Sequence, residues 1–377
     1  MLPTGGLNLE LIDREEELGP VIDSWRSLAA ARGNAFVTPE WYLAALRTLH
    51  VGSAPAVVVA RDANGAVRGL LPFLDTRTRI GRRWASFPGT RYGDIYHPVA
   101  APEDEERIAA AAAPLLAERL GERCRLELGR VDGDAGWWRE LGRRWPAQLT
   151  AVRHPAETLP YIELNGSSWE EYLAGRSRQF RSQVGRKMRS LRREHEVRIR
   201  RPGSGEEALG DVGTLFQLHD ARWTGRDVVS SIADPKVREF HRRFVVEAQQ
   251  RGWLRLYLLE VDATPVAGWY GWRVGHRFSY YQAGFDPAWG GYSVGFLLLA
   301  ETVKEAIAEG ATEYDLLLGD EAFKARFATG KRLGRSVLLA PRLSPPRLRA
   351  SARAWVARRR AARAANSSLG PSARSAP

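Results

Sequence analysis

Two separate stretches of the chain, residues 55–75 and 253–285, consist of short β-rich runs separated by turn residues. In the first stretch, two runs flank Asn64-Gly65, a dipeptide typical of the tight turn of a β-hairpin. In the second, three runs follow one another across short turns, and the last of them is the aromatic run 278–285. The pattern therefore predicts a hairpin in the first half of the chain and a strand–turn–strand–turn–strand segment in the second.

Apolar residues at helical spacing predict helices around these strands. Residues 10–50 have this spacing, and Pro39 suits the first position of a second helix there. A helix over 102–120 is closed by Gly121, and an apolar helix from Ser293 ends at Gly310. A further helix is expected over residues 232–250.

A strongly basic helix is predicted over residues 177–194, after a capping-box pattern at Ser168 to Glu171 starts a shorter one. Its apolar residues form one narrow stripe: Phe180, Val184, Met188 and Leu191. The basic residues point away from that stripe. Two interpretations stand: a solvated helix docked by its stripe, or an electropositive wall that steers an anionic cofactor or acceptor.

The order of elements repeats after about 190 to 200 residues. The two hairpins correspond, the helix 102–120 corresponds to 293–309, and the strand 124–131 corresponds to 312–319. We therefore predict an α+β (α/β) protein of two similar domains, each a mainly antiparallel mixed sheet flanked by helices. The expected bounds are 1–155 and 156–340, followed by a basic tail, 341–377.

The two halves differ at the start of the repeated helix. In the second half a loop of small residues, 286–292, precedes the helix, and Asp286 is the nearest acid. Such a strand–loop–helix junction offers backbone N–H groups and the positive end of a helix dipole to phosphate. In the first half the four residues 103–106 are all acidic and would repel it. Only the second half is therefore expected to bind an anion there.

The net charge of +12 is concentrated in two segments of the 377-residue chain. Residues 341–377 carry nine arginines and no acid, residues 176–201 also carry +9, and the rest carries −6. This is a mildly acidic body with two basic segments, unlike a uniformly basic nucleic-acid-binding protein. The tail is expected to be disordered, or to rest as a basic helix over 342–365 on an anionic membrane or RNA.

Several classes of protein are excluded by the remaining composition. The sequence has no run of about 18 apolar residues that a membrane helix needs, and its first residues do not resemble a secretory signal. A single cysteine, Cys124, leaves no disulfide partner, and the seven histidines show no metal-ligand spacing. We therefore expect a cytoplasmic protein without a metal site. A position at the periphery of the inner membrane is compatible with this expectation.

Charged residues follow the apolar run of the last predicted strand, where reacting groups tend to lie beside a cofactor site. They are Asp315, Asp320, Glu321 and Lys324. A surface cluster of ion pairs is the alternative interpretation. His219 and His241 lie near apolar stripes of their helices, so we interpret them as packing residues.

Four segments in series resemble a known family. They are SRQFRSQVGRKMRSLRRE, LFQLHDARW, YYQAGFDPAWGGYSVGFLLL and EYDLLLGDEAFKARFA. Together they resemble the CelD/BcsL-like branch of the GNAT acyltransferase superfamily, which is related to the FemAB peptidyltransferases. The resemblance covers residues 160–335 well and 1–155 only in general layout. It implies a tandem GNAT fold, acetyl-CoA or another acyl-CoA as donor, an amine or hydroxyl acceptor, and a role in polysaccharide or envelope biosynthesis.

The resemblance also implies which residues bind the donor. The strand that pairs with the pantetheine arm would be Gln282, Ala283, Gly284 and Phe285. The pyrophosphate loop would comprise Gly291, Tyr292, Ser293, Val294 and Gly295. This loop is shorter and less glycine-rich than in many GNAT proteins, so the donor stays open. FemAB-like relatives use aminoacyl-tRNA, and the segment 323–327 resembles their C-terminal motif.

Acyl transfer from a thioester needs an unprotonated nucleophile, a donor to the developing oxyanion, and an acid for the leaving thiolate. We expect direct attack, with Asp320 or Glu321 as base, Tyr281 or Tyr292 as acid or oxyanion donor, and Lys324 positioning an anionic acceptor. The acceptor would be a small molecule, a nucleotide-sugar or a glycan. Two alternatives are a FemX-like aminoacyl-tRNA-dependent peptidyltransferase and a non-catalytic GNAT-fold scaffold in polysaccharide synthesis.

Overall fold

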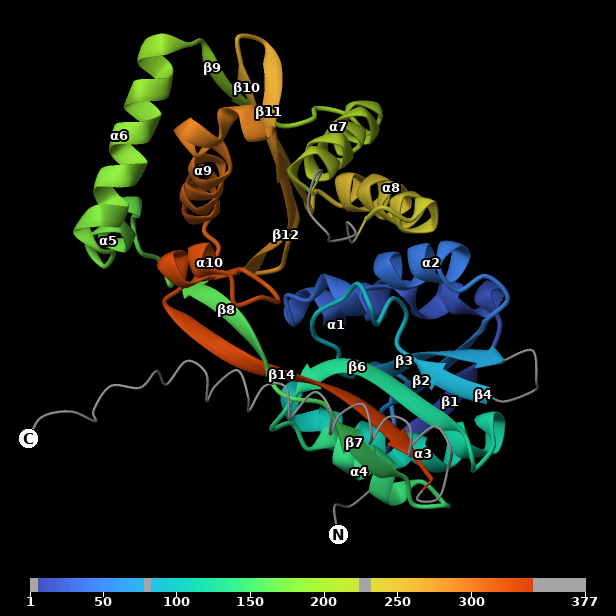
Figure 1. Ribbon diagram of the computed structural model, residues 1–377. Coiled ribbons are helices and arrows are strands. Elements are labelled where there is room, and N and C mark those ends of the chain that lie inside the picture. The colour runs from blue at the N-terminus through green and yellow to red at the C-terminus, as the bar shows by residue number, and fades with distance from the viewer. Residues whose placement is uncertain (1–5, 78–82, 224–231, 342–377) are drawn as a thin grey trace, which may run out of the picture. The chain divides into compact units, whose positions relative to one another are not determined.

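The computed structural model describes residues 6–77, 83–223 and 232–341 (Figure 1). Contacts between residues divide them into two compact units. Unit 1 comprises residues 6–21, 52–77, 83–157 and 333–341. Unit 2 comprises residues 22–51, 158–223 and 232–332.

Unit 1 is a sheet with helices packed against it. Its strands are β1 (Asn8–Ile12), β2 (Ala54–Arg61), β3 (Val67–Arg77), β4 (Arg83–Ser86), β5 (Val99–Ala100), β6 (Arg125–Asp132), β7 (Thr150–Arg153) and most of β14 (Gly330–Ala340). Its helices are α3 (Glu105–Leu120) and α4 (Trp137–Arg144), with 3-10 turns η1 (Glu15–Val21) and η3 (Pro102–Asp104). The strand order is β1-β2-β3-β4-β6-β14, and only the β4–β6 pair in this series is parallel.

The local signals in unit 1 act as predicted. β2 and β3 form an antiparallel hairpin, and Gly65 in its turn has a φ of +84°. The Asp62 carboxylate accepts the backbone N–H groups of Asn64 and Ala66 and so holds the turn. α3 stops at Gly121, whose φ of +89° favours glycine.

Unit 2 contains another set of adjacent strands, with helices on both faces. Its strands are β8 (Glu157–Glu163), β9 (Val197–Arg200), β10 (Leu254–Val261), β11 (Thr264–Val274), β12 (Arg277–Phe285) and β13 (Glu313–Asp315). Its helices are α1 (Ile22–Ala31), α2 (Pro39–Thr48), α5 (Trp169–Ala174), α6 (Arg178–Glu194), α7 (Gly205–Trp223), α8 (Pro235–Gln250), α9 (Val294–Ala308) and α10 (Ala322–Phe327), with 3-10 turns η2 (Ala35–Val37) and η4 (Pro287–Tyr292). The strand order is β8-β13-β12-β11-β10-β9, and the β12–β13 pair is parallel.

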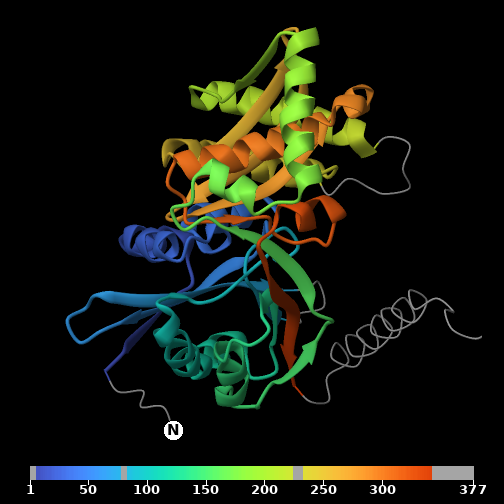
Figure 2. The same cartoon turned by 90° about the vertical axis from the view of Figure 1, so that its left-hand side faces the viewer.

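The two faces of this sheet are covered by different helices. α6 and α9 lie beside each other on one face, and α7 and α8 lie on the other (Figures 1 and 2). On the first face, α6 and α9 contribute to one buried cluster with Trp269, Phe278 and Tyr314 of the strands. On the second, Trp41 of α2 packs edge-to-face against Phe240 of α8 and Trp272 of β11. α2 therefore belongs to unit 2 through its aromatic contacts.

The predicted basic helix is confirmed as α6. Ser177 caps it by accepting the N–H of Phe180, and α5 begins with the predicted capping box at Ser168 and Glu171. The predicted apolar stripe is buried, with every side chain at most 8% exposed: Phe180, Val184, Met188 and Leu191. The stripe docks α6, so its basic residues are left at the surface.

The predicted repeat of element order is also confirmed. In unit 1, β4 and β6 pair in parallel and α3 lies between them in the sequence. In unit 2, β12 and β13 pair in parallel and α9 lies between them. The start of α3 carries the predicted acidic residues, whereas the first turn of α9 has none.

Some predicted bounds were wrong. The segment taken as helical from residue 10 begins with the end of the strand β1, because its backbone pairs with that of β2. The strand expected over 312–319 ends at Asp315, whose carboxylate accepts the N–H of Leu317 and turns the chain. The predicted domain bounds, 1–155 and 156–340, remain a prediction. In the structure, α1 and α2 group with unit 2. The predicted tail helix 342–365 lies outside the described residues, among which no helix is long and apolar enough to cross a bilayer.

Candidate functional site

The centre of unit 2 is the strand β12, which is paired unequally on its two sides. It runs antiparallel to β11 along its whole length but pairs with β13 only over Arg277–Ser279. From Tyr280 to Phe285, no strand among the described residues pairs with it on that side. We call this segment the outer edge of β12. An extended ligand can add to such an edge through backbone hydrogen bonds.

A β-bulge shapes this edge. The register between β11 and β12 shifts so that Gln282 faces Tyr270 and Tyr280 faces Gly271, which leaves Tyr281 as the extra residue. Bulges re-aim side chains beside active sites. Here Tyr280 and Tyr281 lie on opposite faces of the sheet, since Tyr280 lies near Lys324 and Tyr281 packs against Trp272.

Tyr280 lies with the predicted lysine and glutamate. The Lys324 ammonium is 5.7 Å from the centre of the Tyr280 ring, donates to the Leu318 carbonyl oxygen, and is 3.3 Å from the Glu321 carboxylate. Lys324 is only 5% exposed, whereas half of the Glu321 side chain is exposed. Burial raises the pKa of Tyr280 to about 12, so its hydroxyl keeps its proton at neutral pH. The structure therefore gathers a fixed cation, a carboxylate and a phenol at the start of the outer edge.

The segment predicted to pair with the donor forms the rest of this edge and is held by α7. The Ala283 carbonyl oxygen lies 3.5 Å from the Arg222 guanidinium, which also covers the Phe285 ring at 5.4 Å. The Gln282 side chain is hydrogen-bonded to His219 of the same helix. Gly284 packs directly against α7. Arg222 also hydrogen-bonds the Tyr280 hydroxyl, so one guanidinium joins α7 to both ends of the edge.

Tyr281 and Asp320 are not brought into this group. The Tyr281 ring packs against Trp272 and Trp41 on the other face, with its hydroxyl 3.4 Å from Nε2 of His241. Asp320 is exposed next to Glu321 and forms no ion pair with a described residue. The geometry therefore favours Tyr280 over Tyr281 as the tyrosine whose ring lies near Lys324.

His241 is expected to make unit 2 sensitive to acid. Burial lowers its pKa to about 3, against about 6.5 in the unfolded chain. Its contribution to stability is therefore complete above pH 6.5 and is lost as the pH falls toward 3, because protons bind preferentially to the unfolded chain. When the pH is lowered from 7 to 4.5, the unfolding free energy of the wild type should fall by about 2 kcal/mol more than that of His241→Leu. Urea titrations at the two pH values measure this difference. Equal losses in both proteins would contradict this assignment.

The predicted phosphate loop joins β12 to α9. Asp286 caps η4 by accepting the N–H of Ala288, and Ser293 adopts the left-handed conformation, with φ +59° and ψ +44°, just before the helix. The first backbone N–H group of α9 that is hydrogen-bonded within the helix is that of Leu297, which donates to the Ser293 carbonyl oxygen. The N–H groups of the three preceding residues are therefore at the helix start, where anions bind. Of the residues expected to bind the pyrophosphate, Gly291 and Tyr292 lie in η4 and Gly295 in the first turn of α9, while the Val294 side chain is buried in the core.

α6 flanks this loop with polar side chains. The Lys187 ammonium donates to the Gly291 carbonyl oxygen, and the Tyr292 hydroxyl donates to Glu194 at 2.5 Å. Hydrogen bonds from Tyr292, Arg193 and Ser190 lower the pKa of Glu194 to about 2. Further along, Gln183 accepts from Arg326 of α10 at 2.6 Å. The same helix flank thus reaches both the phosphate loop and the segment that holds Lys324.

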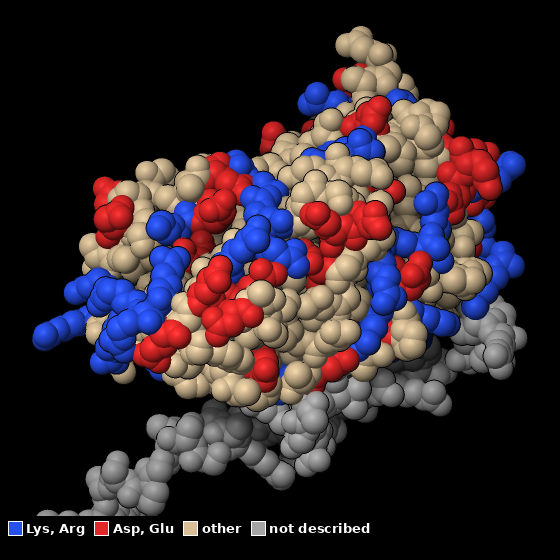
Figure 3. Space-filling model, turned by 90° about the horizontal axis from the view of Figure 1, so that it is seen from above, with Lys and Arg blue, Asp and Glu red and all other residues tan. Residues whose placement is uncertain are grey.

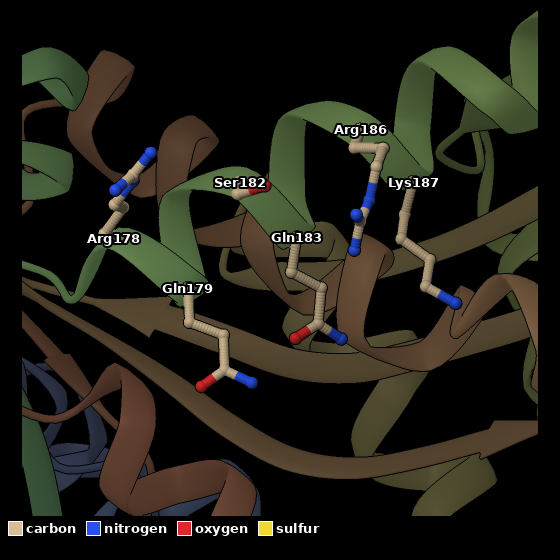
Figure 4. Close-up of a pocket in the computed structure, with 6 residues that line it drawn as sticks. All are labelled: Arg178, Gln179, Ser182, Gln183, Arg186 and Lys187. Carbon is tan, nitrogen blue, oxygen red and sulfur yellow. The ribbon is translucent and has the colours of Figure 1, made fainter.

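A hollow of about 540 Å³ opens on α6 beside these contacts (Figure 4). It is lined by residues of this helix alone: Arg178, Gln179, Ser182, Gln183, Arg186 and Lys187. Seen from above, Lys and Arg gather at the side of the molecule where α6 lies, with acidic side chains interspersed (Figure 3). Within the described part of the chain, no cluster of His, Cys, Asp and Glu is suited to a metal ion.

Three positions of the candidate site were missed from the sequence. Tyr280 was passed over for its neighbour Tyr281, because a bulge cannot be located from one strand alone. Arg222 was not singled out, although a basic residue in the last turn of a helix is a usable signal. Lys187 was counted with the other cations, although it lies next to the apolar stripe and so on the flank that turns inward.

The sequence and the fold have recognisable relatives. Residues 178–325 match the model of an acetyltransferase (GNAT) domain. The fold is similar to that of FemX, with a TM-score of 0.62 and 11% identity, over 84% of this chain and 95% of that one. No curated protein matches the sequence.

Two further solved structures share the fold. The C-terminal domain of a putative lysylphosphatidylglycerol synthetase from Agrobacterium fabrum has a TM-score of 0.53 and 11% identity, over 85% of this chain and 91% of that one. L-PGS from Bacillus licheniformis has a TM-score of 0.51 and 11% identity, over 86% and 93%. At these identities the likeness concerns the fold alone.

Proposed function

We propose that this chain, an acyltransferase with a GNAT-type acetyltransferase domain, takes its acyl group from acetyl-CoA or another acyl-CoA. The observation that carries the proposal is the outer edge of β12, which leads through residues 287–293, none of them acidic, to the start of α9. An extended amide-containing arm can add to the edge, while the helix start receives its pyrophosphate. The acceptor would be an amine or hydroxyl of a polysaccharide, nucleotide-sugar or envelope precursor, in keeping with the resemblance to the CelD/BcsL-like branch.

The residues at the edge supply the electrostatics of acyl transfer. As an acceptor attacks the thioester, negative charge develops first on the carbonyl oxygen and then on the departing sulfur. The buried Lys324 ammonium and the protonated Tyr280 hydroxyl can stabilise that charge without reorganising. Glu321, half-exposed beside Lys324, is placed to receive the proton of the acceptor. Arg222 positions the Tyr280 hydroxyl.

The properties of the only cysteine in the sequence agree with direct attack of the acceptor on the thioester. Cys124 is buried in unit 1, and burial raises the pKa of its thiol to about 12. A thiol that holds its proton this firmly is a poor nucleophile at neutral pH. It also lies in the half of the chain whose repeated helix begins with acidic residues. A covalent acyl–cysteine step is therefore no part of the proposal.

A second candidate donor is aminoacyl-tRNA. The basic surface of α6 and the fold likeness to FemX favour it. Both donors carry an activated acyl group attached to a phosphorylated nucleotide. The two are distinguished by which of them binds.

Calorimetry with acetyl-CoA tests the first proposal. We expect micromolar binding by the wild type and a loss of at least ten-fold in Ser293→Glu, because a negative charge at the start of α9 repels phosphate. Ser293→Asn is the matched control, since asparagine tolerates the left-handed conformation and adds no charge. Failure of the wild type to bind any acyl-CoA, with tight and salt-sensitive binding of tRNA, would replace this donor with the second.

A further inference from the structure

The hollow on α6 has a composition suited to a phosphate ester. Three of its six lining residues are cations, Arg178, Arg186 and Lys187, and none is acidic. The other three are Gln179, Ser182 and Gln183, which hydrogen-bond without adding charge. Its volume of about 540 Å³ is in the range of small-molecule sites.

Two of the three cations of the hollow take no part in ion pairs that hold the described part of the fold. Arg178 and Arg186 are exposed and form no ion pair with any residue that the structure describes. The acid nearest in sequence on α6 is Glu194, which is engaged by Tyr292 and Arg193. The positive charges of Arg178 and Arg186 are therefore not compensated by an acidic side chain of α6. An anionic ligand would compensate them.

The hollow adjoins the phosphate loop. Lys187 lines the hollow and donates to the Gly291 carbonyl oxygen in η4, two residues before the cap of α9. Figure 4 shows the side chains of Gln179, Gln183, Arg186 and Lys187 projecting on the same side of α6. From residue 178 to residue 187 the helix rises by about 14 Å, which is the scale of one nucleotide rather than of a long polymer.

We propose that this hollow binds the 3′-phosphate of the CoA nucleotide, with Arg186 as its principal contact and Lys187 linking it to the loop that receives the pyrophosphate. The inference rests on the proposed donor and adds a second anion site to it. A coenzyme A molecule carries two anionic groups on one nucleotide, the 5′-pyrophosphate and the 3′-phosphate. The loop and the hollow together match that pair.

A membrane surface fits the hollow less well. The apolar residues of α6 are buried in the core, and none lines the hollow. A helix that rests in a lipid interface instead exposes its apolar face. The three cations and two glutamine amides of the hollow favour a discrete ligand with phosphate, hydroxyl and ring nitrogen groups.

The test compares acetyl-CoA with acetyl-3′-dephospho-CoA by calorimetry at fixed ionic strength. We expect the wild type to bind acetyl-CoA about ten-fold or more tightly, the range of charge-assisted hydrogen bonds. In Arg186→Gln that preference should fall to about three-fold or less, with the affinity for the dephospho compound unchanged. Arg189→Gln is the matched control, since it removes the same charge from an exposed position of α6 outside the hollow.

The possible outcomes separate the subsite from the donor. Binding of both compounds by the wild type with equal affinity, or an unchanged preference in Arg186→Gln, overturns the subsite and leaves the donor proposal standing. An equal loss of preference in Arg189→Gln also overturns it, because general electrostatics would then be the cause. If neither compound binds the wild type, the donor proposal fails and the subsite fails with it. In that case, loss of tRNA binding in Arg186→Gln would assign the hollow to RNA.

Discussion

Replacing Lys324 with methionine is expected to lower kcat about 100- to 1,000-fold, the usual effect of removing one preorganised donor to a developing oxyanion. The ammonium is 5% exposed and lies 5.7 Å from the centre of the Tyr280 ring at the start of the outer edge of β12. A fixed charge in such a shielded place acts more strongly than one in water. The measurement is the release of free thiol from acetyl-CoA.

Stability distinguishes this role from a structural one. A buried, partly compensated charge contributes little to folding, and an apolar side chain of similar size often replaces it without loss. We therefore expect the melting temperature of Lys324→Met to stay level or rise while kcat falls. Lys304→Met, at an exposed position of α9, is the matched control and should change neither quantity. An unaltered kcat in Lys324→Met would remove the lysine from the mechanism.

Much of the fold follows from local signals that act over a few residues. Pro39 after Thr38, the Asn64-Gly65 turn, the capping box at Ser168 and Gly121 at a helix end each fix the chain locally, and each is seen in the structure. The repeat of element order could be predicted from the sequence because its elements are marked by local signals of the same kind. The stripe of α6 was readable because helical periodicity places its members on one face.

The arrangement of the site depends on contacts that no local pattern contains. Whether Tyr280 or Tyr281 faces Lys324 depends on a bulge set by pairing with β11. The early end of β13 depends on the turn at Asp315 and creates the outer edge of β12. Arg222 reaches that edge because α7 lies against β12. Residues 22–51, early in the chain, group with unit 2 through aromatic packing that their own periodicity does not reveal.

The position of α7 against β12 leads to the largest expected effect on stability. A Cβ atom added at Gly284 would lie 2.3 Å from the backbone nitrogen of His219 and 2.5 Å from the carbonyl carbon of Leu218. These are backbone atoms of a helix, so they cannot move aside as the end of a side chain can. We expect Gly284→Ala to lower the unfolding free energy by about 3 kcal/mol, the upper part of the range for overpacked cores, as measured by urea unfolding.

The same clash should reach the site. To accommodate the methyl group, α7 has to move away from β12, and Arg222 moves with it, away from the Ala283 carbonyl oxygen and the Tyr280 hydroxyl. Turnover of the folded variant should therefore fall as well. Gly290→Ala is the matched control for the unfolding free energy, because a Cβ atom there meets nothing within 4 Å. If Gly284→Ala were as stable as Gly290→Ala, the close packing of α7 on β12, and with it the placement of Arg222, would be wrong.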